Sequence, residues 1–283
     1  MQSLEIISLG LGVQSTALYY MSSMGDLPRV DYAIFSDLGR EGEETYAYLD
    51  YLLDWQKQND GVPIIVRKEK NLYRDLLNSE NSTGQRFASI PAFTLNDDGT
   101  TGMLRRQCTG EYKIQVVDNA IRDLYGLKPK QRRPETRVWQ GITLDEIERM
   151  SIPQDAWKVN YYPYIGYAAS KNKGGYRVAT ETDMTKSRAD LYSWYIQKGL
   201  PIPPKSACIF CPYQSDVRWY DMKENHPDDF EDACLVDQRI RNSTKKGINN
   251  PVFIHSSCKP LSEIVFDKHA EFEWGECSGN CHI

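Results

Sequence analysis

The sequence predicts an α/β protein built on a parallel, twisted sheet with helices on both faces. Short apolar runs at residues 4–9, 29–37 and 62–68 have the length and the unbroken hydrophobicity of strands buried in such a sheet. Helix-like segments at residues 15–24 and 43–58 separate these runs. Strands that alternate with helices in this way are joined by right-handed crossovers, which make neighbouring strands parallel.

The next part of the chain supplies one more helix and one more strand. We expect the helix at about residues 109–124 and the strand at residues 136–144. Residues 79–104 are polar, contain glycine and are poorly periodic, so they predict a long loop over an edge of the sheet, with a lid as one role. We therefore assign residues 1–150 to one α/β domain.

The chain after residue 150 predicts a mostly helical region. Periodic segments at residues 187–198, 215–223 and 227–241 are typical of helices, and loops connect them. We expect residues 151–283 to pack on the same core as the first domain. This region carries most of the seven cysteines.

Length and cysteine content narrow the class of protein. A chain of 283 residues can form one large domain or a domain with a smaller appendage. It has no apolar run of about 18 residues and does not start with a basic and then an apolar segment, so we expect neither a membrane span nor a secretory signal. The expected location is cytoplasmic. In that reducing compartment, seven cysteines favour metal or redox chemistry over disulfides.

The charge distribution bears on nucleic-acid partners. A net charge of −5 argues against a protein that coats nucleic acid with its whole surface. Local basic stretches occur at Arg105 and Arg106 and at residues 128–137. Each is either a solvated loop or an edge that contacts phosphates, so a nucleic-acid substrate stays among the candidate partners.

A glycine-rich turn at residues 10–15 joins the first strand to the first helix. Backbone N–H groups and the positive end of the helix dipole meet at such a turn, so its expected guest is a phosphate. Two well-known phosphate loops do not fit. Ser15 stands where the dinucleotide fingerprint needs its third glycine, and the Walker lysine has no counterpart because the first lysine is Lys57.

The turn resembles the pyrophosphate loop of the PP-loop superfamily, usually written S-G-G-x-D-S. Its sequence, G-L-G-V-Q-S, agrees at Gly12 and Ser15 and departs at Gln14, where the family usually has aspartate. The resemblance implies that the turn binds the pyrophosphate of ATP or a related adenine nucleotide, with Mg²⁺ as a further candidate.

Four further segments resemble the phosphoadenylylsulfate (PAPS) reductase-like family, in an iron–sulfur-like branch with a Cys-x-x-Cys-Pro motif. They are "SDLGREGEETYAYLD" at 36–50, "RRQCTGEYKI" at 105–114, "QGITLDEIERM" at 140–150 and the region around "CIFCP" at 203–230. They occur in family order, so the resemblance covers nearly the whole chain. It implies a Rossmann-like fold of the adenine nucleotide alpha hydrolase type.

The resemblance also implies which residues meet the nucleotide, since ligands bind at the carboxyl edge of such sheets. Asp37 could instead cap the following helix. Asp145 and Arg149 are the candidate catalytic residues, although with Glu146 they could form an exposed ion pair of little energetic value. The candidate nucleotide-binding residues are Ser8, Gly10, Gly12, Gln14, Ser15, Asp37, Gly39, Glu41 and Gly141.

Cys208 and Cys211 have the spacing that lets two thiolates reach one metal centre. From the spacing alone, a structural zinc, a redox-active pair and an iron–sulfur cluster all stay open. The resemblance implies a [4Fe-4S] cluster near the nucleotide, held by this pair and by Cys108. Zinc is the alternative metal.

The fourth ligand has to come from elsewhere, or the cluster keeps an open iron. Cys281 is the expected ligand, with Cys258 and Cys277 as alternatives. Glu276 and Cys277 resemble the Glu-Cys element of PAPS reductases, whose cysteine attacks the sulfonucleotide, so Cys277 is also the candidate nucleophile. Cys234, in an amphipathic helix, is expected to be a small buried hydrophobe.

These features predict an ATP-binding enzyme that adenylylates a nucleic acid or nucleotide and then transfers sulfur with the help of an iron–sulfur cluster. A sulfur-donor protein is a candidate partner. One alternative is a sulfonucleotide reductase that releases sulfite from PAPS or adenylylsulfate through Cys277. Another is a non-catalytic nucleotide-binding protein braced by zinc.

Overall fold

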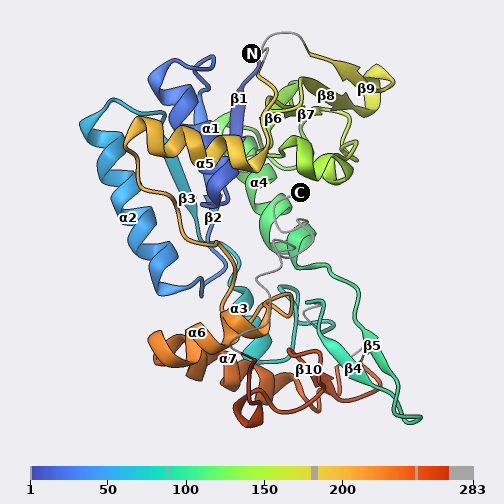
Figure 1. Cartoon of the computed structure of the whole chain (residues 1–283). Coiled ribbons are helices and arrows are strands. Elements are labelled where there is room, and N and C mark those ends of the chain that lie inside the picture. The colour runs from blue at the N-terminus through green and yellow to red at the C-terminus, as the bar shows by residue number, and fades with distance from the viewer. Residues whose placement is uncertain (1, 88–89, 180–183, 246–247, 268–283) are drawn as a thin grey trace.

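A seven-stranded sheet forms the upper part of the molecule in the computed structural model (Figure 1). The structure describes residues 2–87, 90–179, 184–245 and 248–267. The strands of this sheet are β1 (Glu5–Ser8), β2 (Tyr32–Ser36), β3 (Ile64–Arg67), β6 (Thr136–Trp139), β7 (Lys158–Tyr162), β8 (Tyr167–Ser170) and β9 (Gly175–Val178). Their order is β3-β2-β1-β6-β7-β8-β9. The first four neighbouring pairs are parallel and the last two are antiparallel.

Helices cover both faces of this sheet, which confirms the predicted fold class. The helices are α1 (Val13–Met24), α2 (Glu43–Gln58), α4 (Gln115–Leu124) and α5 (Arg188–Lys198). Successive residues of β1 point to opposite faces, and each face has its own apolar core. Ile7 packs with α1, α2 and α5, whereas Ile6 packs with α4. Both side chains are fully buried.

The helix ends follow sequence signals. α1 ends at Gly25, whose φ of +86° is in the left-handed region that glycine adopts without strain. α5 begins with a capping box in which Ser187 and Asp190 bond to each other's backbone N–H groups. Within the described residues, no helix is long and apolar enough to cross a membrane.

The main sheet continues past residue 150, where a mostly helical region was expected. β7, β8 and β9 all follow that residue and extend the sheet beyond β6. β7 is fully buried although its sequence contains the polar residues Lys158 and Asn160. Lys158 is buried because it pairs with Asp118 of α4, and Asn160 because its amide donates to the carbonyl of Ser151. The expected boundary at residue 150 therefore falls inside the sequence that builds the main sheet.

The elements that form a second apolar core lie below the main sheet in Figure 1. It unites α3 (Leu72–Leu77), α6 (Asp216–Asn225) and α7 (Pro227–Ile240) with a small antiparallel sheet. Its buried residues come from both halves of the chain, for example Leu38 and Tyr112 from the first and Phe210 and Trp219 from the second. The two cores thus do not divide the chain at a single point.

The segment 79–104 is not a loop over the edge of the main sheet, as the sequence had suggested. It carries β4 (Phe93–Leu95) and β5 (Thr101–Met103), which pair with β10 (Val252–Phe253) in the order β10-β4-β5. Strands of two or three residues are too short to show a period-two pattern. The expectation of a loop or lid is therefore corrected to a hairpin in the second sheet.

Candidate functional site

The turn between β1 and α1 closes on itself through Ser15. The N–H of Gly10 donates to Ser15 Oγ at 3.0 Å, and that hydroxyl lies 3.4 Å from the carbonyl oxygen of Gly12. Leu11 adopts a left-handed φ of +58° to make the turn. Within the described residues, no side chain caps the start of α1 at Gly12. The first N–H groups of the helix are therefore available to an anion.

Two glycines border this turn in different ways. A Cβ built on Gly12 meets no described atom within 4 Å, so the space above the turn is open. A Cβ built on Gly141 would lie 2.7 Å from the backbone nitrogen of Ser15 and 2.9 Å from the carbonyl carbon of Gln14. The segment after β6 thus packs directly on the backbone of the turn, and the open space at Gly12 is where a phosphate would fit.

Gln14 connects the turn to the segment after β6. Its amide donates to Glu146 Oε2 at 2.5 Å and to Thr143 Oγ1 at 3.3 Å. Glu146 also forms salt bridges with Arg149 and with Arg188, the latter at 2.5 Å. The carboxylate of Glu146 therefore joins two cations to Gln14, the loop position where the PP-loop pattern usually has aspartate.

The group around Arg149 is not the exposed ion pair considered from sequence. The side chains of Arg149 and Glu146 are only 9% and 14% exposed. Burial lowers the pKa of Arg149, and its Nε has no hydrogen-bond partner among the described residues. Asp145, in contrast, is exposed and accepts a hydrogen bond from the backbone N–H of Arg188 at 3.0 Å. Of the two candidate catalytic residues, Arg149 lies beside the turn and Asp145 braces the start of α5.

Asp37 stabilises the turn that follows β2. Its Oδ1 accepts hydrogen bonds from the N–H of Gly39 at 2.8 Å and from the Tyr46 hydroxyl at 2.9 Å. Its Oδ2 lies 3.4 Å from Lys68 Nζ. Gly39 has a φ of +96°, and a Cβ there would lie 2.4 Å from atoms of Asn71. Asp37 and Gly39 therefore both stabilise this turn, and their contact with a nucleotide stays a prediction.

A pocket lies between α4 and the carboxyl ends of β1, β2 and β6. It is lined by Ser8, Gly10, Ser36, Gln140 and Lys113, among others. Lys113 lies on the short π-helix η1 (Thr109–Ile114), which leads into α4. The pocket thus brings Ser8 and Gly10 together with a cation that was not among the candidates. Lys113 is the lysine of the C-T-x-x-x-K-I stretch, so the sequence did contain a signal for it.

The same lysine lines a second pocket that contains the three expected metal ligands. Cys108, Cys208 and Cys211 lie on its wall together with Arg106 and Lys113. The N–H of Cys211 donates to the carbonyl of Cys208 at 3.0 Å, which closes the Cys-x-x-Cys turn. Segments about 100 residues apart in the chain therefore place their thiols around one cavity.

Glu41 lies beside this cysteine pocket. It forms an isolated β-bridge with Cys208, whose Sγ is 3.8 Å from Glu41 Oε1. The side chain is fully buried, and Oε2 has no hydrogen-bond partner in the described parts of the chain. Burial raises the pKa of Glu41. Glu41, a candidate nucleotide-binding residue, is thus a neighbour of Cys208.

The surroundings favour protonated thiols in the protein alone. Burial raises the pKa of Cys108 and of Cys208, and that of Cys211 to about 11. Lys113 acts in the opposite direction on all three. A bound metal centre would supply the further positive charge that buried thiolates need.

The donor chemistry of the three thiols fits an iron–sulfur cluster or zinc. Among the described residues, however, no three or more His, Cys, Asp or Glu side chains converge closely enough to hold a metal ion. Cys277 and Cys281 lie outside the described residues. Cys258 is buried, whereas Cys234, expected to be buried, is half-buried and packs against the second core.

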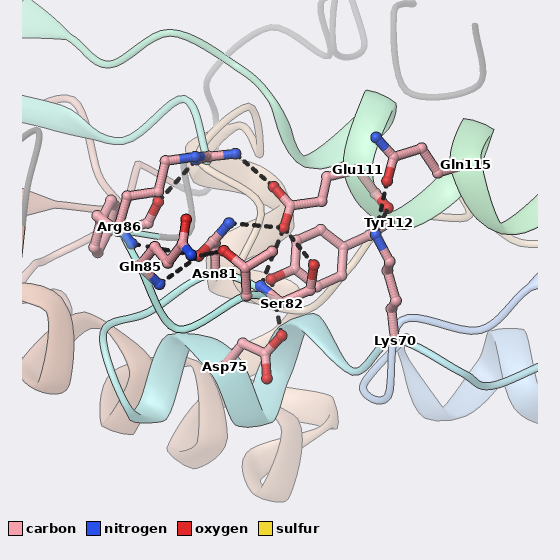
Figure 2. A network of polar contacts seen from close by, with 11 residues as sticks. Lys70, Asp75, Asn81, Ser82, Gln85, Arg86, Glu111, Tyr112 and Gln115 are labelled. Carbon is pink, nitrogen blue, oxygen red and sulfur yellow. Dashed lines mark hydrogen bonds and ion pairs between the residues drawn. The ribbon is translucent and has the colours of Figure 1, made fainter.

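A polar network fixes the segment that carries Cys108 and Lys113 (Figure 2). Glu111 accepts hydrogen bonds from the Asn81 amide at 3.0 Å, from the Ser82 N–H at 3.0 Å and from Arg86 Nη2 at 2.5 Å. On the same segment, the Tyr112 hydroxyl donates to Asp75 at 2.9 Å. Residues 81–86, which belong to the segment expected to be a loop or lid, thus tie the wall of both pockets to the second core.

The two basic stretches lie at different edges of the main sheet. Arg106 lines the cysteine pocket. Residues 128–135 precede β6, whereas the turn at residues 10–15 follows β1, which runs parallel to β6. The basic loop therefore lies at the opposite edge from the turn. Contact of both stretches with a polynucleotide substrate stays a prediction.

The fold and the site define a class: an α/β protein with an open glycine turn at the carboxyl edge of its sheet, and a three-cysteine pocket that shares Lys113 with the pocket at this turn. A comparison with protein-family models gave no match, and a search of curated proteins gave none either. Membership of the PAPS reductase-like family therefore stays a prediction from the motifs. The geometry around Lys113 carries the functional argument.

Proposed function

We propose that the protein is an ATP-binding enzyme of the PAPS reductase-like PP-loop class that adenylylates a nucleic acid or nucleotide and then transfers sulfur to it. The observation that carries this proposal is the position of Lys113, which lines both the pocket beside the turn and the pocket of the three cysteines. A substrate activated at the first pocket would thus be next to sulfur chemistry at the second.

In the first step, the turn would hold the pyrophosphate of ATP. The start of α1 has open space at Gly12, and Arg149 is linked to Gln14 through Glu146, with its Nε unpartnered within the described chain. An oxygen of the acceptor attacks the α-phosphorus, the bond to pyrophosphate breaks, and the acceptor becomes an adenylate. If that oxygen belongs to a hydroxyl, its proton passes to water. Positive charge at the turn stabilises the leaving pyrophosphate.

In the second step, sulfur at the oxidation level of sulfide displaces AMP, so the exchange is redox-neutral. The sulfur comes from a donor protein. When bound, a [4Fe-4S] cluster held by Cys108, Cys208 and Cys211, with Cys281 or an open position as the fourth site, would supply the sulfur-binding chemistry. Lys113 and Arg106 would offset the negative charge of the thiolates and attract the adenylate.

Product analysis tests the proposal. Anaerobically purified protein is incubated with ATP, with and without a polynucleotide, and AMP and pyrophosphate are measured. Formation of both only with the polynucleotide supports the proposal. Sulfite released from PAPS without ATP consumption supports a reductase that uses Cys277. A colourless, zinc-containing protein without turnover supports a non-catalytic nucleotide-binding protein.

A further inference from the structure

A third pocket lies at the amino-terminal edge of the main sheet, away from the turn at residues 10–15. It has a volume of about 380 Å³ and is bounded by the end of α4, the turn before β6 and the start of β7. Four cations line it, together with one acid and one tryptophan. These residues are Arg122, Lys130, Arg132, Arg133, Glu135 and Trp157. We call this the basic pocket.

Three of the acids around the basic pocket form salt bridges with other cations. Asp123 pairs with Arg67 at 2.6 Å, and Glu135 pairs with Lys173 at 2.6 Å. Asp118 pairs with Lys158. None of the four lining cations, in contrast, forms a salt bridge with an acid of the described chain. A protein with a net charge of −5 thus concentrates unneutralised positive charge in one cavity.

Arg133 is held in place by an aromatic ring. Its guanidinium lies 4.5 Å from the centroid of the Trp157 ring, a cation–π arrangement. Burial and the neighbouring charge of Arg122 lower the pKa of Arg133, and Asp118 and Asp155 do not fully offset these effects. A stacked guanidinium has a fixed direction for its N–H donors, which suits planar or phosphate acceptors. The cations of the pocket are thus crowded and partly pre-ordered.

We propose that the basic pocket binds the phosphate backbone of a nucleic-acid strand. Lys130 and Arg132 are exposed at its mouth, where successive phosphates could reach them, and Arg133 lies deeper beside Trp157. The four residues of β6 span about 13 Å at about 3.3 Å per residue and separate this pocket from the edge of the sheet that carries the turn, so the two are distinct sites. The proposal does not depend on the reaction at the turn.

A charge-reversal experiment tests this assignment. Binding of a fluorescent single-stranded DNA of about 20 nucleotides, longer than the ~4–16 nucleotides that single-strand sites cover, is measured by anisotropy at several salt concentrations. The variant Lys130→Glu with Arg132→Glu should bind at least about tenfold more weakly. The negative slope of log K against log salt should become shallower by about 1.4, or about 0.7 for each phosphate that a cation no longer neutralises. Lys57→Glu with Lys259→Glu changes the net charge equally at exposed positions away from the pocket.

Two further measurements separate this proposal from the proposed function. The Lys130 and Arg132 variant should keep its affinity for ATP, and Gly12→Ala should keep its affinity for the oligonucleotide. Circular dichroism checks folding, and Arg132→Gln repeats the test with a milder change. Equal weakening in the Lys57 and Lys259 control would overturn the assignment. So would complete displacement of the oligonucleotide by millimolar inorganic phosphate at constant ionic strength, because it indicates a small-anion site.

Discussion

Gly12 and Gly141 lie on two sides of the same turn, yet each is a glycine for a different physical reason. At Gly12 the backbone has an ordinary φ of −89°, and the missing side chain leaves open space over the helix start. At Gly141 the missing side chain permits contact between two backbone segments. Gly12 therefore keeps space free for the proposed ligand, and Gly141 permits the close backbone packing that the fold requires.

This difference predicts opposite outcomes for two alanine substitutions. Gly12→Ala should change the free energy of unfolding by no more than about 0.5 kcal/mol, because the added methyl meets nothing in the described protein. It should weaken ATP binding at least tenfold, or about 1.4 kcal/mol, because the methyl takes the space of a phosphate. Gly141→Ala should lose about 1–3 kcal/mol of stability from overpacking. Urea denaturation and calorimetric ATP titration measure the two effects, and unchanged ATP affinity in Gly12→Ala would contradict the assignment of the turn.

The role of Glu146 also depends on its neighbours. It is the partner of Arg149, whose side chain is 9% exposed. Removal of one partner of a buried pair leaves an uncompensated charge, so Glu146→Ala should lose about 3–5 kcal/mol in the free energy of unfolding. Asp145→Ala serves as the matched control, because it removes only an exposed hydrogen bond to the first N–H of α5, next to the Ser187 cap, and should lose about 0.5–2 kcal/mol. Equal losses in the two variants would refute the distinction between these adjacent acids.

At the scale of elements, the π-helix η1 and the start of α4 carry much of the site. This segment presents Cys108 and Lys113, and Glu111 ties it to residues 81–86. Hydrogen bonds to a buried carboxylate are stronger than neutral ones. The position of the cysteine pocket thus depends on residues 81–86, which lie outside the proposed nucleotide and metal sites.

Glu111→Ala should release this loop without unfolding the main sheet. We expect faster amide hydrogen exchange in residues 81–86 and a loss of about 1–3 kcal/mol in stability, because the donors of Asn81 and Ser82 lose their acceptor. Exchange in β1 and β2 should stay at the wild-type rate. Gln115→Ala is the control, since it removes only the exposed hydrogen bond from Lys70 Nζ. Unchanged protection of residues 81–86 would show that other contacts hold the loop.

The elements show what the sequence could and could not predict. α2 begins and ends at the predicted residues because its amphipathic period is a local signal. β7 was missed because its buried Lys158 and Asn160 have partners elsewhere in the chain. The turn at residues 10–15 was recognisable from its glycines, but the contact between Gln14 and Glu146 joins positions 132 residues apart. No local pattern encodes such a contact.

At the scale of the whole molecule, two cores are joined by segments that cross between them more than once. Leu38 follows a strand of the main sheet and packs in the second core, and Tyr112 does so just before α4. The turn at residues 10–15 belongs to the upper part and the Cys-x-x-Cys turn to the lower part, and Lys113 lines both pockets. Relative motion of these parts would change the distance between nucleotide and sulfur chemistry.

The central claim is that cysteines from distant segments hold one iron–sulfur centre next to the nucleotide turn. The most direct test is iron and acid-labile sulfide analysis of anaerobically purified protein, with Cys108→Ser compared with Cys234→Ser. We expect about four iron and four sulfide per chain in the wild type and in Cys234→Ser, and loss of both in Cys108→Ser. A wild-type iron and sulfide content in Cys108→Ser would contradict it.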